Sequence, residues 1–262
     1  MINLFLGTIA SLVFLGIIFI PMERVFPAKQ QAVFREQYRL DLLFFLGQYL
    51  LWGGLVLLGL YYFNGWLNNI VPAGFRSYVK SWPWVLQVFC VVVLSDFLIY
   101  WAHRLQHSIP FLWRFHKTHH TSEKLDWLAA HREHPIDSIY TVGIINLPAL
   151  ILGFPLSSII ALITFRGIWA IFIHSNVRLN IGPLKKIIGS PELHHWHHTK
   201  SQKAGNYANI SPIMDILFGT YYDPGKKDLE YGIHEDSPKT YLGHLIQPLV
   251  PKKKKNGPKN IS

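Results

Sequence analysis

Four long apolar stretches dominate the pattern of the chain. They cover Leu4–Ile20, Leu42–Phe63, Val85–Ala102 and Ile139–Ile173. A helix needs about 20 apolar residues to cross a bilayer, so the second and third stretches are predicted to span a membrane. The first stretch is short for a span. Because it lacks a basic start and a small-residue cleavage site, we interpret it as a retained anchor rather than a cleaved signal peptide.

The fourth stretch is too long for one membrane helix. It is interrupted by Gly153-Phe154-Pro155, and glycine and proline so close together end helices. We therefore expect a hairpin of two helices in this part of the chain. The expected fold class is all-α, an integral-membrane helical bundle with a histidine-rich helical cap on its cytosolic side.

The basic residues divide unevenly between the segments that flank these stretches. Of the 25 lysines and arginines, 22 lie in 21–41, 103–138 and 174–262, whereas Arg76 and Lys80 lie between the second and third stretches. Loops rich in lysine and arginine stay on the cytoplasmic side of a membrane. The pattern predicts an external amino terminus and a cytoplasmic carboxyl terminus. It also explains the formal charge of +10 by topology rather than by binding of nucleic acid.

Three histidine clusters lie beside the apolar stretches. They are His103 and His107, then His116, His119 and His120, and finally His194, His197 and His198. Residues three or four apart on a helix share a face, so we expect each cluster to turn its histidines the same way. Imidazole is a good ligand of iron, copper, nickel and zinc. Eight imidazoles exceed the needs of one four-coordinate site, which predicts two metal ions.

Other histidines receive different interpretations. His174, at the end of the hairpin, and His134 are further candidate ligands, which makes ten in all. Pro135 pushes His134 away from helical geometry, and we favour His134 over its neighbour His131 as a ligand. His195 points away from the face of its cluster, and we expect it to have a supporting or structural role. His234 and His244 stand alone in a polar region and are predicted to lie on the surface.

Two charged residues lie inside the apolar stretches. Asp96 precedes His103 by seven residues and shares nearly the same helix face. Intramembrane carboxylates are functional candidates, so Asp96 is predicted either to support a ligand imidazole or to form an interior hydrogen bond to another helix. Arg166 lies in the hairpin. It is expected either to extend toward the membrane interface or to pair with Asp96.

The histidine motifs resemble those of the fatty acid hydroxylase and sterol desaturase superfamily of di-iron membrane enzymes. The resemblance covers roughly residues 85–225 and rests on HRLQH at 103–107, HKTHH at 116–120 and HHWHH at 194–198. Segment 130–137 is similar to a motif of sterol C-5 desaturases, whereas the stretch around His174 is similar to alkylglycerol monooxygenases.

The resemblance implies a chemistry and a set of partners. It implies two iron ions, molecular oxygen as co-substrate, and a separate haem or iron–sulfur electron carrier with its reductase. Zinc can replace iron during purification, because imidazole also binds zinc. No Gly-rich dinucleotide fingerprint is present, so direct binding of NAD(P)H is not expected. The expected substrate is a sterol-like or long-chain membrane lipid, with desaturation as the first choice and hydroxylation as the second. No catalytic residue beyond the metal ligands is expected.

The resemblance also divides the chain. Residues 1–84 are expected to hold amino-terminal spans, 85–225 the catalytic domain, and 226–262 a polar tail whose run of lysines is solvated.

Two other classes of protein remain as alternatives. A metal transporter would hold its ligands near the bilayer midplane, and a non-catalytic lipid-binding protein would keep zinc as a structural ion.

Overall fold

The computed structural model describes residues 2–179, 181–200, 205–225 and 229–250. Within these ranges the regular structure is helical, as predicted, and no strand is present. The lysine run at 252–255 lies outside the described residues. The longer helices are α1 (Ile2–Val25), α3 (Gly53–Ile70), α5 (Trp84–Ser108), α7 (Pro135–Ile151) and α8 (Leu156–His174).

Four helical segments are long and apolar enough to cross a membrane. They are Ile2–Val25, Tyr38–Ile70, Trp84–Ser108 and Ser157–His174. The second of these joins α2 (Tyr38–Gly47), the short π-helical segment η1 (Gln48–Trp52) and α3 into one 33-residue run. The spans predicted in the second and third apolar stretches are confirmed as helices of this kind. The first stretch, which is short for a span in the sequence, and the second helix of the hairpin also lie in such segments, and the protein is an integral membrane protein.

The hairpin predicted at Gly153 is also confirmed. Helix α7 ends at Ile151 and α8 begins at Leu156, and Gly153 between them has a φ of 81°, which favours glycine. The guanidinium of Arg76 donates hydrogen bonds to the carbonyls of Leu150 and Ile151. A cation at this position satisfies the last carbonyls of α7 and offsets the negative end of the helix dipole.

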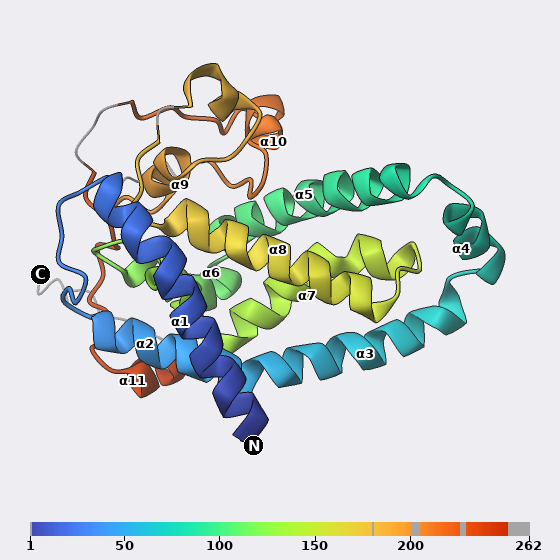
Figure 1. The fold of residues 1–262 in the computed structure, drawn as a ribbon, viewed down its shortest axis with the longest axis horizontal. Coiled ribbons are helices and arrows are strands. Elements are labelled where there is room, and N and C mark those ends of the chain that lie inside the picture. Colours follow the sequence, from blue (N-terminus) through green and yellow to red (C-terminus); the bar gives the residue numbers. More distant parts are fainter. Residues whose placement is uncertain (1, 180, 201–204, 226–228, 251–262) are drawn as a thin grey trace, which may run out of the picture.

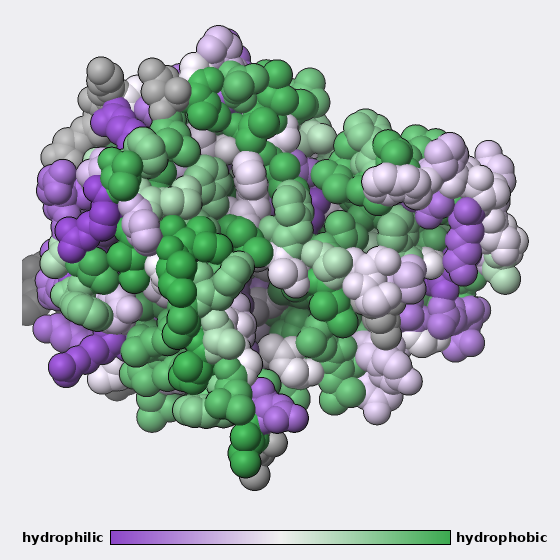
Figure 2. Space-filling model, in the orientation of Figure 1, coloured by the Kyte–Doolittle hydropathy of each residue, from purple (hydrophilic) through white to green (hydrophobic). Residues whose placement is uncertain are grey.

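Short helices gather at one end of the bundle and form a cap. Figure 1 shows α3, α5, α7 and α8 side by side, with α4 (Ala73–Lys80) at one end and the cap at the other. Figure 2 shows an apolar surface over the middle of the molecule and hydrophilic residues toward both ends. The helices of the cap are α6 (Pro110–His116), η2 (His119–Thr121), η3 (Ala129–His131), η4 (Gly182–Lys186), α9 (Pro191–His197), α10 (Ile213–Leu217), α11 (Tyr241–Ile246) and η5 (Gln247–Leu249).

A buried ionic network joins the amino-terminal part of the chain to the cap. Arg35 donates to Asp41 and Asp126 at 2.7 Å each, and Arg132 donates to the second oxygen of Asp41 at 2.5 Å. All four side chains are buried. Each carboxylate faces a guanidinium, so burial of these charges is compensated by hydrogen bonds.

Asp96 makes interior contacts rather than supporting a ligand, but its hydrogen bonds go to a loop of the cap and not to another helix as predicted. Its carboxylate accepts hydrogen bonds from the backbone N–H groups of Ile210 and Ser211, at 3.1 and 2.9 Å. Arg166 pairs with Asp96, and their closest charged atoms are 3.6 Å apart. Asp96 therefore fixes a loop of the cap against α5 and α8 instead of supporting a histidine ligand.

Candidate metal centre

Five histidines converge in a first group at the cap end of α5. Their ring nitrogens lie within 4.8 Å of one another, and we call them group A. The members of group A are His103, His107, His116, His120 and His197. Helix α5 extends beyond its apolar segment into the cap, and His103 and His107 occupy adjacent turns of this extension. His116 is the last residue of the short helix α6, His120 lies in η2, and His197 reaches the group from the end of α9.

Four other histidines form a second group, group B, that meets the same distance limit. Its members are His119, His174, His194 and His198. The Nε2 atom of His174, the last residue of α8, lies 2.9 Å from Nε2 of His119 and 2.9 Å from Nε2 of His194. The Nε2 atom of His198 lies 3.1 Å from those of His174 and His194.

Each HxxHH motif contributes histidines to both groups. This differs from our expectation that all histidines of one cluster face the same way. In HxxHH at 116–120, the first and last histidines belong to group A and His119 belongs to group B. In HxxHH at 194–198, the first and last belong to group B and His197 belongs to group A. The groups are in contact, since the rings of His120 and His198 stack with their centroids 4.4 Å apart.

Backbone carbonyls fix the orientation of several imidazoles. The Nδ1 atoms of His103, His174 and His197 lie 2.8, 2.6 and 2.8 Å from the carbonyl oxygens of Tyr207, Ala170 and Gly205. A carbonyl only accepts, so each Nδ1 carries the hydrogen and each Nε2 presents a lone pair. This arrangement is common for metal-binding histidines, whose outer nitrogen donates to a fixed acceptor.

The inner nitrogens fit a metal ion better than they fit each other. His119 Nδ1 lies 3.3 Å from the carbonyl of Arg132, so the Nε2 atoms of His119 and His174 face each other at 2.9 Å as two lone pairs. Such an approach is repulsive unless a cation lies between them. When two nitrogens each lie about 2.1 Å from one ion and the nitrogen–ion–nitrogen angle is about 90°, the nitrogens are about 3 Å apart. The observed spacings therefore match a coordination shell.

The acceptor behind His116 is a carboxylate rather than a backbone carbonyl. Asp137 accepts a hydrogen bond from His116 Nδ1 at 2.9 Å, and its other oxygen accepts one from Gln106 at 2.7 Å. A carboxylate behind a ligand imidazole raises its basicity and fixes its orientation. The Nε2 atoms of His103 and His116 are 3.1 Å apart, so group A has the same lone-pair approach as group B.

The environment of groups A and B favours neutral imidazoles. Burial lowers the pKa of His119 to about 3. Burial, reinforced by the neighbouring histidines, also holds the pKa values of His116, His120, His194 and His198 well below their usual range. Neutral imidazole is the form that binds metal. Nε2 of His107 and of His197 are buried without a hydrogen-bond partner among the described residues, and both belong to group A.

One candidate ligand lies outside both groups. The structure places His134 at the start of α7, where Nδ1 accepts a hydrogen bond from the N–H of Ile136 and Nε2 lies 3.1 Å from the carbonyl of Leu245. Both ring nitrogens are thus used within the protein. Pro135 explains the difference, because proline favours the first position of a helix and leaves the preceding residue to cap it. Our preference for His134 over His131 as a ligand is not supported.

The remaining histidines have structural positions. His131 is buried and its Nδ1 lies 2.8 Å from the side-chain oxygen of Gln48. His195 is buried between the carbonyl of Ser175 and the hydroxyl of Tyr231, in agreement with a structural role. His234 is exposed, as predicted. The prediction that His244 lies on the surface is wrong, since it is 1% exposed and packs against Phe44.

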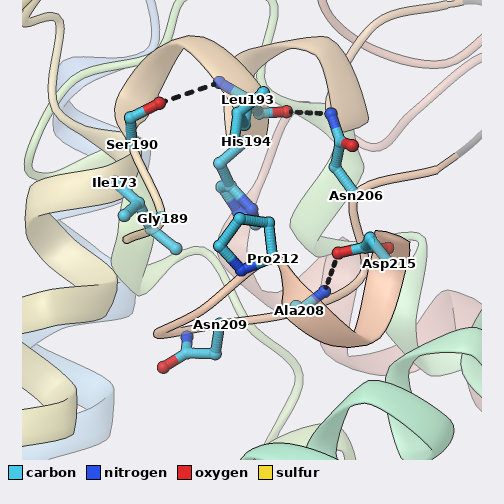
Figure 3. A pocket seen from close by; sticks show the side chains of 10 residues that line it. All are labelled: Ile173, Gly189, Ser190, Leu193, His194, Asn206, Ala208, Asn209, Pro212 and Asp215. Carbon is cyan, nitrogen blue, oxygen red and sulfur yellow. Dashed lines mark hydrogen bonds between the residues drawn. The ribbon is translucent and has the colours of Figure 1, made fainter. Parts of the chain in front are cut away.

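A small pocket adjoins group B. Figure 3 shows His194 between Leu193 and Pro212, with Asn209 and Ile173 nearby. The volume of the pocket is about 10 Å³, close to the space that one water molecule needs. The Nδ1 atom of His194, which is turned away from group B, is buried without a hydrogen-bond partner among the described residues. The pocket therefore combines apolar and polar lining residues, among them the candidate ligand His194.

The backbone acceptors and Asp137 were not identified from the sequence. Asp137 was visible only as the last residue of a motif, with no spacing that linked it to His116. Gly205 leaves a weak signal. A Cβ atom at this position would lie 2.5 Å from the carbonyl oxygen of Thr220, so only glycine brings this carbonyl to His197.

The chain is similar to proteins that are named as lipid hydroxylases, monooxygenases and desaturases. The family model described as fatty acid hydroxylase matches residues 88–220. Ornithine lipid hydroxylase of Rhizobium tropici is 34% identical over 67% of this chain and 54% of its own length. Human alkylglycerol monooxygenase is 34% identical over 59% of this chain and 34% of its own length. No solved structure showed significant similarity to the chain.

Sterol desaturases are also among the relatives. A putative Delta(7)-sterol-C5(6)-desaturase of Arabidopsis thaliana is 33% identical over 53% of this chain and 49% of its own length. The chain spans about half of this relative and of the ornithine lipid hydroxylase, and about a third of the alkylglycerol monooxygenase. Hydroxylases and desaturases therefore match the chain to similar degrees.

Proposed function

Because the chain belongs to the fatty acid hydroxylase family, we propose that it is an oxygen-dependent membrane enzyme that hydroxylates a long-chain lipid at a centre of two iron ions. The observation that carries this proposal is the convergence of nine histidines into groups A and B. One ion would be held by each group. Iron supplies the activation of oxygen that breaking an unactivated C–H bond requires and that acid–base side chains lack.

The protein side of this chemistry is orientation and exclusion of water. Carbonyls and Asp137 turn the imidazoles inward, and the groups lie at the cap-side ends of α5 and α8. A lipid chain held among these helices would bring a carbon to the centre without leaving the apolar phase. Position also argues against a metal transporter, because such ligands are expected near the bilayer midplane.

The overall reaction requires an electron donor. When a C–H bond becomes C–OH with oxygen from O₂, the second oxygen atom leaves as water and takes up two electrons and two protons. We propose that a separate haem or iron–sulfur protein with its reductase delivers these electrons.

We further propose that the cap is cytoplasmic. Arg76 and Lys80 lie on α4, at the opposite end from the cap and the other flanking basic residues, which supports this orientation (Figure 1).

Desaturation of a sterol is the second candidate function. Segment 130–137 favours it, because this segment is similar to a motif of sterol C-5 desaturases. Its two histidines lie outside groups A and B, however, and Asp137 is the residue of the segment that contacts a candidate ligand. The similarity of this segment is thus explained by packing of the cap as well as by substrate choice. We place hydroxylation first for this reason.

Oxygen uptake with defined lipids tests the proposed function. We expect iron-loaded protein in lipid nanodiscs, supplied with a ferredoxin and its reductase, to consume oxygen above background with an ornithine lipid or an alkylglycerol. The product should carry one added oxygen atom. A Delta(7)-sterol that loses two hydrogens instead would favour the second function. Turnover of a water-soluble substrate without any response to lipid would contradict both, and zinc-loaded folded protein should be inactive.

A further inference from the structure

The cap carries a group of exposed apolar side chains on two segments. One segment is η4 with the residues that follow it, and the other is α10. Six side chains on them are between 42% and 67% exposed, and we call them the cap apolar surface. They are Leu184, Ile187, Ile188, Ile213, Ile216 and Leu217. Figure 2 shows apolar residues gathered over this part of the cap, beside α10.

Hydrogen bonds hold the two segments together. The hydroxyl of Ser211 donates to the carbonyl of Ile187 at 2.6 Å, and the N–H of Gly189 donates to the carbonyl of Ile210 at 2.7 Å. The apolar residues of both segments therefore belong to one continuous surface. A soluble protein seldom exposes so many large aliphatic side chains together unless they meet a partner.

The position of α10 along α5 identifies the partner. The loop before α10 is bonded to Asp96, which lies within the apolar segment of α5 and twelve residues before its end. The ring of Phe218, just after α10, packs on Tyr100 and Trp101 at centroid distances of 5.3 and 4.9 Å. Helix α10 thus lies against the side of a membrane span rather than beyond its end.

The same loop is fixed to the neighbouring span. Trp169 of α8 donates a hydrogen bond to the carbonyl of Asn209 at 3.0 Å, and Arg166 of α8 pairs with Asp96. The loop is bonded to two spans on its inner side, so the outward face of α10 continues their lipid-facing surface. Phe97 of α5, which is 37% exposed, extends this surface toward the middle of the span.

We infer that the cap apolar surface is inserted into the interfacial region of the lipid bilayer. Apolar faces of such helices typically enter about 5–10 Å into the boundary between headgroups and acyl chains. The exposed Lys186 lies between Leu184 and Ile187, where its long side chain reaches back to the headgroups. The cap is therefore attached to the bilayer by this surface as well as by the membrane-spanning helices.

Membrane insertion also brings lipid next to the pocket beside group B. Two residues that line the pocket, Gly189 and Pro212, directly adjoin Ile188 and Ile213 of the surface. His194, a member of group B, lines the same pocket beside Pro212 (Figure 3). If the proposed function holds, lipid at the cap apolar surface lies on the side from which a chain approaches His194.

Quenching of a fluorescent label by brominated lipid tests the inference. Cys90 is the only cysteine, so Cys90→Ser provides a background for Ile216→Cys and Leu184→Cys, each labelled with bimane. The control is His234→Cys, on an exposed residue of the cap outside the surface. In phosphatidylcholine vesicles with brominated acyl chains we expect several-fold stronger quenching at 184 and 216 than at 234, together with blue-shifted emission.

Equal quenching at the three positions would overturn the inference. Emission that depends on protein concentration and not on brominated lipid would also overturn it, since it would assign the surface to contact between two copies. Elution of each labelled variant as a single peak shows that it is folded. The experiment needs no turnover, so its outcome is independent of whether the proposed lipid oxidation is correct.

Discussion

Replacing His119 or His197 with alanine is expected to abolish lipid turnover. His119 belongs to group B and His197 to group A, so each change removes a candidate ligand from a different group. Removing a partner of a metal ligand typically lowers affinity or activity about 10–100-fold, and loss of a ligand itself should exceed that range. Oxygen uptake with the lipid substrate, at equal protein abundance, measures the effect.

His234→Ala is the matched control for this experiment. Its side chain is exposed and belongs to neither group, so activity should stay close to that of the unchanged protein. If all three variants lost activity to the same degree, the assignment of groups A and B as the reactive centre would be wrong. Full activity of His119→Ala would equally contradict a role for group B.

Replacing Asp41 with alanine is expected to cause the largest loss of stability. Its two oxygens bind Arg35 and Arg132, and the side chains of all three residues are at most 1% exposed. Removing one partner of a buried ion pair typically costs about 3–5 kcal/mol, because the remaining charge is left without compensation. A lowered unfolding temperature of the protein in detergent, by scanning fluorimetry, would reveal this loss.

The effect should extend to the metal centre. The carbonyl of Arg132 accepts the hydrogen bond from His119, so displacement of Arg132 also frees that imidazole. Asp236→Ala removes an exposed carboxylate of the cap and serves as the control. An unfolding temperature for Asp41→Ala equal to that of the control would show that the buried network contributes little.

The sequence was sufficient to predict the spans and the hairpin because both depend on local properties. Apolar length predicted spans in the second and third stretches, and Gly153 with Pro155 predicted the break in the fourth stretch. The spacing of histidines selected eight residues that the structure brings together, and His174, chosen from its place at the end of the hairpin, is the ninth. Helical geometry explains why the motifs were misassigned to single faces. Adjacent residues of a helix are about 100° apart, so HxxHH spreads its histidines widely enough to serve two sites.

Long-range contacts explain what could not be predicted. His244 stands alone in the sequence, and its burial against Phe44 depends on how α11 packs on α2. The acceptors of the ligand imidazoles are mostly backbone carbonyls, which have no sequence signature. The role of Asp96 depended on a cap loop more than a hundred residues later in the chain. His134 is the exception, since the proline after it is a signal of a helix start that we interpreted only as a departure from helical geometry.

Metal content per chain is the measurement that tests the two-ion centre most directly. Elemental analysis of folded, active protein, combined with its protein concentration, should give two metal ions per chain, with iron in the active form. His119→Ala and His197→Ala should each lower this number, because they alter different groups. A single ion, or none, in an active preparation of the unchanged protein would contradict the account.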